Sequence, residues 1–325
     1  MLISLDKPRV GVLRGGPSPE YEVSLDTGST VLANLPEEYE PVDILISKDG
    51  GWYLQGIEKK PASILQHLDV AVNALHGAYG EDGTIQKMLE QFGVPYTGSE
   101  SLPSAVGMNK ALAKNIFKQH GLQTPYHLVV NQSDDLGQLV KKINESIPFP
   151  VIVKPTSSGS SLGVSYIAAV KELLPALEKA FALGPQVLVE EFIQGKQGTC
   201  GVIENFRGSS LYTLLPTEIM LEKNPVYTYE LKYGDMGHGY RIPGNWSERE
   251  KADVEELARE SHRALGLRHY SRTDFIIHPR RGVFILEVNT LPTLTHRSSF
   301  IKSLEAAGGT IKEFLAHLIS RALRR

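Results

Sequence analysis

The sequence predicts a mixed protein in which an N-terminal α/β unit with a parallel sheet precedes an α+β part that is rich in antiparallel strands. Up to about Gly98, apolar strand patterns alternate with helical patterns, which is typical of a parallel sheet with helices on its faces. From Gly195 onward, successive apolar runs between turn residues indicate antiparallel strands instead. A length of 325 residues is enough for two or three domains.

The N-terminal unit is predicted from three apolar strands and two helices. The strands are expected at 9–15, 41–47 and 69–75, and the helices at 22–35 and 84–93. Ligands of such sheets bind beyond the carboxyl ends of the strands, where Arg14-Gly15-Gly16 and His76-Gly77 fall. A glycine pair differs from the GxGxxG fingerprint of dinucleotide sites, so the pattern does not favour a nicotinamide cofactor.

After Gly98, helical and strand patterns continue to alternate until the antiparallel part begins. Helices are expected at 109–121, 135–145, 170–183, 247–266 and 310–322, and strands at 127–131, 148–155, 186–193, 199–208 and 210–221. Basic residues at the end of the terminal helix suit the negative end of its dipole. Boundaries near residues 98 and 190 divide the chain into predicted domains 1–98, 99–190 and 191–325.

Composition and charge indicate a globular protein without a general affinity for polyanions. Hydrophobic residues make up 41%, charged residues 22%, and the formal net charge is −3, which predicts no nucleic-acid partner and no membrane binding. No apolar run approaches 18 residues, and the opening MLISLDKPRV is too short and too polar for a signal peptide, so a cytoplasmic protein is expected. The single cysteine, Cys200, lies in an apolar strand-like stretch and is expected to be buried.

Residues 272–289 predict a β-hairpin with polar side chains on one face. The sequence RTDFIIHPRRGVFILEVN has two apolar runs around a Pro-Arg-Arg-Gly turn. With that turn, Asp274 lies opposite Glu287, and Arg272 lies opposite Asn289. All four side chains then share one face, because side chains alternate along a strand.

The opposed carboxylates of Asp274 and Glu287 need a positive group near them, because like charges facing each other destabilise a sheet. Asp, Glu and Asn offer only oxygen ligands, which suit Mg²⁺, and Mg²⁺ completes its shell with water and substrate phosphates. The pattern therefore indicates nucleotide chemistry. The alternative is a solvated polar strand face on which Arg272 pairs with one carboxylate.

A polar loop and three lysines also point to an anion site. In VIVKPTSSGSSLGVS, Lys154 ends a buried strand and small or hydroxyl residues follow, whose backbone N–H groups can approach an oxyanion closely. An ordinary surface loop is the alternative, but a lysine that ends an apolar strand requires a counter-charge. Lys110 opens a helix, and Lys232 lies in the aromatic, glycine-rich segment 227–240, which suggests a lid. Taken singly, each lysine also fits a solvated side chain.

Nine segments in order make the chain resemble the ATP-grasp ligases, and within them the D-alanine–D-alanine ligase family. The segments are RGGPSPEYEVSL, ALHGAYGEDGTIQ, YTGS, MNKALAK, VIVKPTSSGSSLGVS, VLVEEFI, YELKY, RTDF and LEVNT. The resemblance extends from end to end of the chain. It implies a Rossmann-like, or pre-ATP-grasp, N-terminal domain followed by a two-lobed ATP-grasp fold that holds the nucleotide between two sheets.

The resemblance also implies the reaction, which joins two D-alanines at the expense of ATP for peptidoglycan precursors. The carboxylate of the first D-alanine would attack the γ-phosphate to give an acyl phosphate, and the amine of the second would then displace phosphate. Two Mg²⁺ ions, with Mn²⁺ as an alternative, would neutralise the growing phosphate charge. A cytoplasmic homodimer is expected for the same reason.

Site residues follow from positions that match the family's motifs. Asp274, Glu287 and Asn289 resemble its metal ligands, and Arg272 resembles the group that stabilises the transferring phosphoryl and the tetrahedral oxyanion. Nucleotide contacts are implied for Lys110, Lys154, Ser160, Glu190, Phe192, Ile193, Gln197 and Lys232, with Glu190 as the acceptor for the adenine amino group. Glu20 and His76 are implied to contact the first D-alanine, and Ser298 the second. A hydrogen-bond chain through Ser160 and Tyr233 is implied to close the loops over Glu20.

Four of these residues also have purely structural explanations. Glu20 precedes a helix and could serve only the helix dipole. His76 could be a hydrogen-bonded structural histidine, and Tyr233 could be an apolar anchor for the lid. Ser298 has Ser299 beside it, which leaves the register there open.

Some positions depart from the family pattern, and they leave the second substrate open. Thr293 stands where the family commonly has a glycine, which keeps a backbone N–H but not the angles that glycine permits. His296-Arg297 replaces a smaller pair, and Gln197 replaces a glutamate that contacts the ribose. Alternatives are therefore a ligase for D-serine, D-lactate or another amino acid, or a nucleotide-binding relative without turnover. Tyr233 favours an amine nucleophile, and the transition-state arginine Arg272 argues against a mere binder.

Overall fold

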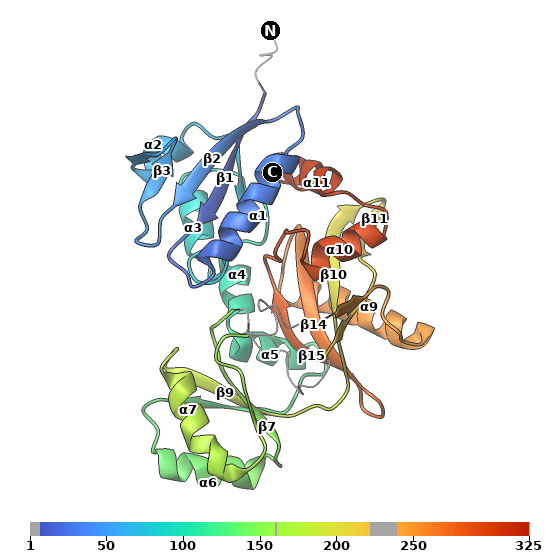
Figure 1. The fold of residues 1–325 in the computed structure, drawn as a ribbon. Coiled ribbons are helices and arrows are strands. Elements are labelled where there is room, and N and C mark those ends of the chain that lie inside the picture. The colour runs from blue at the N-terminus through green and yellow to red at the C-terminus, as the bar shows by residue number, and fades with distance from the viewer. Residues whose placement is uncertain (1–6, 160, 222–238, 325) are drawn as a thin grey trace.

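Three sheets organise the chain in the computed structural model (Figure 1), which describes residues 7–159, 161–221 and 239–324. The N-terminal sheet lies at the top of the view and the central sheet at the bottom, and α4 (Ser101–Met108) and α5 (Lys110–Gln119) lie where the parts meet. The predicted mixed α/β and α+β fold is confirmed, whereas the domain boundaries near 98 and 190 stay predictions. Three predicted site residues lie outside the described residues: Ser160, Lys232 and Tyr233.

The N-terminal sheet has a parallel core with an antiparallel edge. Its order is β4 (Ile57–Lys59), β3 (Trp52–Leu54), β2 (Glu40–Ile46), β1 (Arg9–Gly15) and β5 (Val70–Asn73). β1 pairs in parallel with β2 and β5 as predicted, and β3 and β4 add an antiparallel extension that the sequence analysis did not include. Since β1 and β5 are parallel neighbours, the loops that carry Glu20 and His76 leave the sheet at the same edge.

The central sheet is entirely antiparallel. Its order is β6 (His127–Asn131), β9 (Gln186–Glu191), β7 (Val151–Pro155) and β8 (Ser165–Ile167). Val151 and Val153 pack against α6 (Leu136–Ser146) and α7 (Leu173–Phe181). Because side chains alternate, Lys154 points to the opposite face, where it meets Glu190 from the neighbouring strand β9.

The C-terminal sheet contains the hairpin predicted from the sequence. Its order is β13 (Gly239–Arg241), β12 (Thr217–Met220), β10 (Lys196–Phe206), β14 (Tyr270–His278) and β15 (Gly282–Asn289), and β11 (Ser209–Thr213) also pairs with β10. α9 (Glu248–Ala264) packs on this sheet through Val254 and Ala258. Cys200 is buried in the same core, as expected.

The hairpin has the predicted register at the site but not at its turn. Asp274 pairs with Glu287, and Arg272 pairs with Asn289, as predicted. At the turn, however, His278 pairs with Gly282, so three residues rather than four form the loop. The register shifts by one residue between Asp274 and Phe275, so a bulge restores the pairing that the predicted turn would have given directly.

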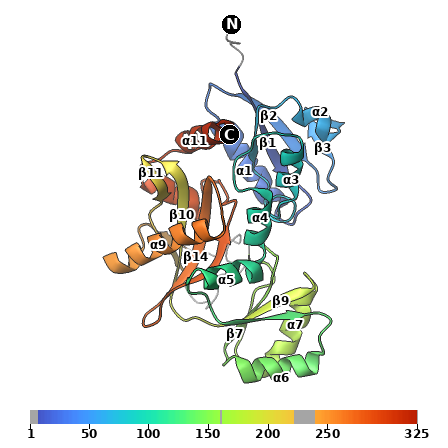
Figure 2. The same cartoon turned by 180° about the vertical axis from the view of Figure 1, so that it is seen from behind.

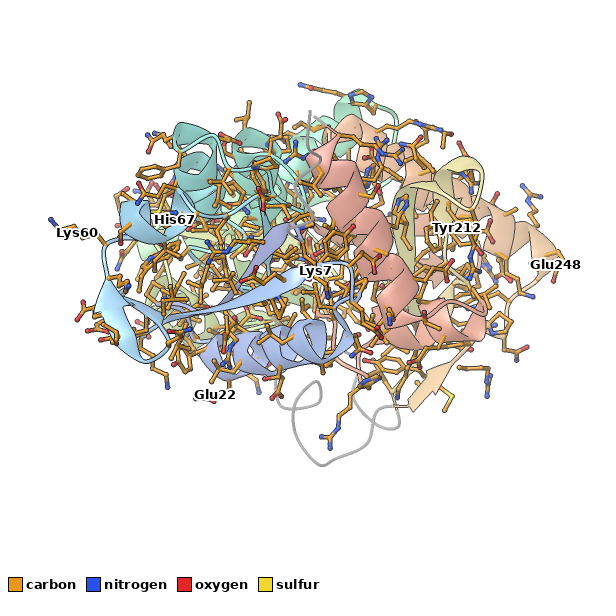
Figure 3. The ribbon with its side chains drawn as sticks, turned by 90° about the horizontal axis from the view of Figure 1, so that it is seen from above. Lys7, Glu22, Lys60, His67, Tyr212 and Glu248 are labelled. Atoms are coloured by element: carbon orange, nitrogen blue, oxygen red, sulfur yellow. The ribbon has the colours of Figure 1, made fainter. Side chains whose placement is uncertain are left out.

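The C-terminal helices join the N-terminal sheet to the C-terminal sheet. α10 (Ser299–Ala306) and α11 (Ile311–Leu323) share one buried core with strands β1 and β5, in which Phe300 and Phe314 pack near Val10 and Val70. Seen from above in Figure 3, they lie between the side of the molecule that carries Glu22 and Lys60 and the side that carries Tyr212 and Glu248. Throughout 7–324, apart from the two undescribed gaps, no helix has the length and apolarity that a membrane crossing requires.

A second junction links the N-terminal unit to the start of β14. The Arg268 side chain donates to the Gly98 carbonyl at 2.7 Å, and the Gly98 N–H donates to His269 Nδ1 at 3.0 Å. His269 is buried, has a left-handed φ of 66°, and donates its own N–H to Glu204 at 2.7 Å. Burial lowers the pKa of His269 to about 4, so the imidazole is neutral and its Nδ1 can accept the Gly98 hydrogen bond.

We expect this histidine to make stability fall in mild acid. Unfolded His269 binds a proton near its ordinary pKa of 6.5, whereas the folded form resists protonation down to about 4. Between these values the unfolded state holds more protons, so the free energy of unfolding falls as pH falls and is fully retained above about 6.5. Urea unfolding at pH 7 and pH 5 should show that the wild type loses about 2 kcal/mol more than His269→Asn. Asparagine tolerates the left-handed φ, and equal losses would contradict the prediction.

Candidate active site

A cleft between the central and C-terminal sheets gathers most of the predicted nucleotide and metal residues. It encloses about 760 Å³ of space, open solvent included. Its walls include seven predicted residues: Lys154, Glu190, Phe192, Ile193, Gln197, Asp274 and Glu287. Residues that lie far apart in the sequence therefore meet in one place.

Part of the cleft lining is apolar and is called the apolar slot below. Ile152 and Phe192 from the central part face Ile276 and Leu286 of the hairpin, and Ile193 lies beside them. Ile193 packs in a small buried cluster with Ile276 and Phe284, and the ring of Phe192 meets that of Tyr166 edge to face. Two apolar walls with Glu190 between them suit a flat aromatic ring that carries a hydrogen-bond donor.

Glu190 is buried and lies between two lysines. Lys154 Nζ lies 2.5 Å from one carboxylate oxygen and Lys114 Nζ lies 3.0 Å from the other. The three residues are at most 6% exposed. Burial alone would raise the pKa of Glu190, but the charges of Lys114 and Lys154 outweigh it and hold that pKa below its ordinary value. Glu190 is thus an ionised acceptor at the base of the apolar slot.

The buried Arg272 and the half-buried Asp274 form a bidentate ion pair two residues apart on β14. The Arg272 Nε and Nη2 atoms each donate to one Asp274 oxygen at 2.8 Å. Burial alone would lower the pKa of Arg272, but the carboxylates of Asp274 and Glu287 raise it, so the guanidinium stays charged. Thr199, directly opposite on β10, donates its hydroxyl to Asp274 at 2.7 Å. Both partners are therefore held in one orientation before any ligand arrives.

Glu287 and Lys110 connect the hairpin to the polar loop. Lys110 Nζ lies 3.3 Å from Glu287 Oε2 and donates to the Ser158 carbonyl at 2.5 Å. Asn109 caps the helix that carries Lys110 by accepting the N–H groups of Ala111 and Leu112. The cap fixes Lys110 at the first turn of α5, facing the loop and the hairpin together.

Two cationic side chains neutralise the opposed carboxylates of Asp274 and Glu287. Arg272 pairs with Asp274 and Lys110 pairs with Glu287, so each of the two opposed carboxylates has a cationic partner. In the described residues, no group of three or more His, Cys, Asp or Glu side chains has the arrangement of a metal site. The oxygen donors Asp274, Glu287 and Asn289 nonetheless share one face, as the register places them. This set fits Mg²⁺, which takes few protein ligands and fills its shell from phosphates and water.

Glu20 lies at the other end of this region, between two glycines. It is the N-cap residue of α1 (Tyr21–Asn34), but its side chain makes no capping hydrogen bond. A Cβ on Gly77 would lie 2.6 Å from Glu20 Oε2, and one on Gly159 would lie 2.5 Å away. The Glu20 carboxylate therefore lies between the loop after His76 and the polar loop after Lys154, and its role as a substrate contact stays a prediction.

His76 is buried and bonded at both ring nitrogens. Its Nε2 lies 2.8 Å from Thr27 Oγ1, and its Nδ1 lies 3.3 Å from Glu81 Oε1. These partners fit the structural explanation of this histidine. Gly77 follows His76, and a Cβ at Gly77 would clash with Glu20, so His76 helps to hold the backbone beside that carboxylate.

The segment after the hairpin places Ser298 at the N-cap of α10. Its hydroxyl oxygen accepts the Ile301 N–H at 3.2 Å, which leaves the hydroxyl hydrogen able to donate. His296 and Arg297 are exposed, and His296 lies 3.5 Å from Glu305 on α10. Thr293 is half-buried. The substituted pair His296-Arg297 is thus directed to the surface of α10.

Two residues of the site are absent from the sequence-based prediction. Lys114 shares the helical face of Lys110 at a spacing of four residues, so the motif MNKALAK already contained the signal. Thr199 contacts Asp274 only because β10 and β14 pair, and no local sequence pattern predicts that pairing.

Comparison with known families covers nearly the whole chain. The pattern described as "D-ala D-ala ligase C-terminus" matches residues 116–320. The pattern described as "D-ala D-ala ligase N-terminus" matches residues 9–66 and 55–99.

Individual relatives agree with these matches. A D-alanine–D-alanine ligase of Pelotomaculum thermopropionicum is 35% identical over 97% of this chain and 96% of its own length. One from Geobacter sulfurreducens is 38% identical over 90% of this chain and 86% of its own. Among solved structures, a D-Ala:D-Ser ligase from Enterococcus faecalis has a TM-score of 0.85 at 26% identity, covering 98% of this chain and 100% of the other. A D-alanine–D-alanine ligase from Bacillus anthracis complexed with ATP has a TM-score of 0.80 at 30% identity, with 98% of both chains covered.

Proposed function

This chain belongs to the D-alanine–D-alanine ligase family, and we propose that it joins two D-alanines into a dipeptide at the expense of ATP, for peptidoglycan precursor synthesis. One observation carries the proposal: the apolar slot, the ionised Glu190 and the fixed Arg272–Asp274 pair line or adjoin a single cleft. The cleft therefore offers groups that suit the base, the phosphate chain and the reacting phosphoryl group of a nucleotide.

ATP occupies this cleft with its base between the apolar walls. Glu190 accepts the adenine amino group, Phe192 and Ile193 cover the ring, and Gln197 bonds the ribose hydroxyls. The phosphates are bound by Ser160 of the polar loop and by three lysines: Lys110, Lys154 and Lys232. Lys154 leaves Glu190 to do so, and Lys110 already touches the loop backbone at Ser158.

The metal site of the proposal consists of Asp274, Glu287 and Asn289. Mg²⁺ or Mn²⁺ bound there supplies charge neutralisation at the phosphates, and two ions are expected. The opposed carboxylates and the half-buried position of Glu287 fit such a site, where Asp274, Glu287 and Asn289 would hold the ion. Lys110, which pairs with Glu287 in the structure, would then be able to turn toward the phosphates.

Glu20 holds the ammonium of the first D-alanine, beside the wall that His76 supports, and the chain through Ser160 and Tyr233 closes over it. The carboxylate of that D-alanine attacks the γ-phosphorus, and ADP leaves. The amine of the second D-alanine, whose carboxylate Ser298 holds, attacks the acyl carbon, and phosphate leaves. Arg272 stabilises the negative charge in both steps, because its guanidinium is fixed before the reaction starts.

The test measures phosphate release from purified protein with ATP and Mg²⁺, with D-alanine present or omitted, and identifies the product by mass. We expect release that depends on D-alanine and yields the dipeptide. ATP binding without D-alanine-dependent release would overturn the proposed reaction.

A ligase for a different second substrate is the alternative that a specific observation favours. The structural neighbour from Enterococcus faecalis is a D-Ala:D-Ser ligase, and Thr293 departs from the family pattern near the second substrate. A panel of D-alanine, D-serine and D-lactate as acceptors separates the two readings. Preferred use of an acceptor other than D-alanine would favour the alternative.

Glu20→Gln is expected to raise the KM for the first D-alanine about 10- to 100-fold with a smaller effect on kcat. The substitution removes the negative partner of the substrate ammonium but keeps the shape and a hydrogen-bond acceptor. Steady-state kinetics checks it, with Glu22→Gln as the matched control, because Glu22 lies on the same helix and its side chain is 77% exposed. An unchanged KM would indicate that Glu20 serves only the dipole of the helix that follows it.

Family membership also supports a homodimer in the cytoplasm. Sedimentation of the purified protein tests the first point, and fractionation of cells that produce it tests the second.

A further inference from the structure

Lys114 is a buried cation that the mechanism above does not use. Its side chain is fully shielded from solvent in the middle of α5. Its Nζ donates to the Thr124 hydroxyl at 2.5 Å, and Thr124 donates in turn to the Ile285 carbonyl at 3.0 Å. Lys114 is thereby anchored to the segment before β6 and to strand β15, and it faces Glu190 from a fixed position.

The cluster of Lys114, Glu190 and Lys154 holds one more positive charge than it needs. One lysine is enough to neutralise Glu190, and a second buried ammonium costs desolvation free energy. Glu287 supplies part of the opposing negative charge, and an anion that enters the site can supply the rest. Lys154 ends strand β7 and is followed by the polar loop, so it is the member of the pair that can turn to phosphate.

We propose that Lys114 is a positioning residue that keeps Glu190 charged and oriented for the adenine amino group when Lys154 turns to the phosphates. This inference rests on the proposed ATP-binding roles of Glu190 and Lys154. Without Lys114, a Glu190 released by Lys154 would be a lone buried carboxylate. It would then take up a proton or hold Lys154 back from the phosphates.

The position of α5 allows two of its lysines, Lys110 and Lys114, to serve different ends of the nucleotide. Figures 1 and 2 place α5 between the central part and the β14–β15 hairpin. Residues four apart share one helical face, so Lys110 meets Glu287 and the polar loop at the phosphate end, and Lys114 meets Glu190 at the base end. One helix thus presents two lysines to the two ends of the nucleotide.

Lys114 is charged at neutral pH in spite of its burial. Burial lowers its pKa to about 8, and the negative charges of Glu190 and Glu287 oppose that effect. Lys154 acts in the same direction as burial. At pH 7 the ammonium therefore persists and can serve Glu190.

The experiment compares Lys114→Met with Lys118→Met in the full-length protein. Lys118 is exposed on the same helix and undergoes the same change of charge. Nucleotide binding is measured by titration calorimetry at pH 7 without D-alanine, using ATP and purine riboside triphosphate, which lacks the adenine amino group. Lys114→Met should weaken ATP binding at least about tenfold and shrink the preference for ATP over the analogue, whereas Lys118→Met should change neither.

A double substitution separates positioning from folding. Lys114→Met removes one positive charge from the cluster, but combining it with Glu190→Gln keeps the net charge of the cluster unchanged. If Lys114 acts through Glu190, its loss should cost less ATP affinity in the Glu190→Gln background than in the wild type. Equal costs in both backgrounds, or an unchanged ATP preference in Lys114→Met, would overturn the inference. Failure of the wild type to bind ATP would instead overturn the proposed nucleotide site itself.

Discussion

Arg272→Ala is expected to lower kcat by a factor of about 10³ to 10⁵, the range observed for arginines that stabilise phosphoryl transfer. Arg272 is only 6% exposed, and Asp274 fixes it through two hydrogen bonds. A charge that is fixed before the reaction lowers the barrier without a cost of reorganisation at the transition state. Because Arg272 acts on charge that develops during the reaction, ATP affinity should fall far less than kcat.

Steady-state kinetics of dipeptide formation and direct ATP titration together check this expectation. Arg280→Ala is the matched control, because Arg280 lies on the turn of the same hairpin and is exposed. Arg272→Lys should also lose most of the rate, since an ammonium cannot reproduce a bidentate pair. A kcat within tenfold of the wild type for Arg272→Ala would remove Arg272 from the catalytic machinery.

The hairpin shows how far the sequence could predict the site. Its polar face was predicted correctly, although the predicted four-residue turn was wrong. In the structure a three-residue loop ends at Gly282, whose φ of 85° is left-handed. That loop alone would turn Glu287 to the opposite face, because a shift of one residue reverses every side chain. The bulge that follows Ile285 reverses the shift, and no sequence pattern identifies such a bulge.

Helix boundaries and buried partners were predictable to different degrees. Strands such as β1 and β6 were predicted at their observed residues, since their apolar patterns are local. α4 was not predicted, because Pro103 and small residues obscure its periodicity. Contacts such as that between Thr199 and Asp274 depend on which strands become neighbours, which is a property of the whole fold.

Asp274→Asn and Glu287→Gln are each expected to lower kcat by at least about 10³-fold at ordinary Mg²⁺ concentrations. Each removes one of only two charged oxygen ligands at the proposed metal site, and a bound metal contributes several kcal/mol of charge stabilisation in such reactions. Excess Mg²⁺ or Mn²⁺ should restore part of the activity by mass action. Glu58→Gln, on the exposed edge strand β4, serves as the control.

The two substitutions should differ in stability, and that difference separates the metal role from the ion pairs. Asp274→Asn leaves the buried Arg272 without its carboxylate and should cost about 3 kcal/mol of folding free energy. Glu287→Gln frees Lys110 from a carboxylate whose side chain is 30% exposed, so the melting temperature should change little. Mg²⁺ titrations of phosphate release and thermal melts measure both effects. If Glu287→Gln kept the wild-type dependence on Mg²⁺, the carboxylate would serve only Lys110, and the hairpin face would be a set of ion pairs and not a metal site.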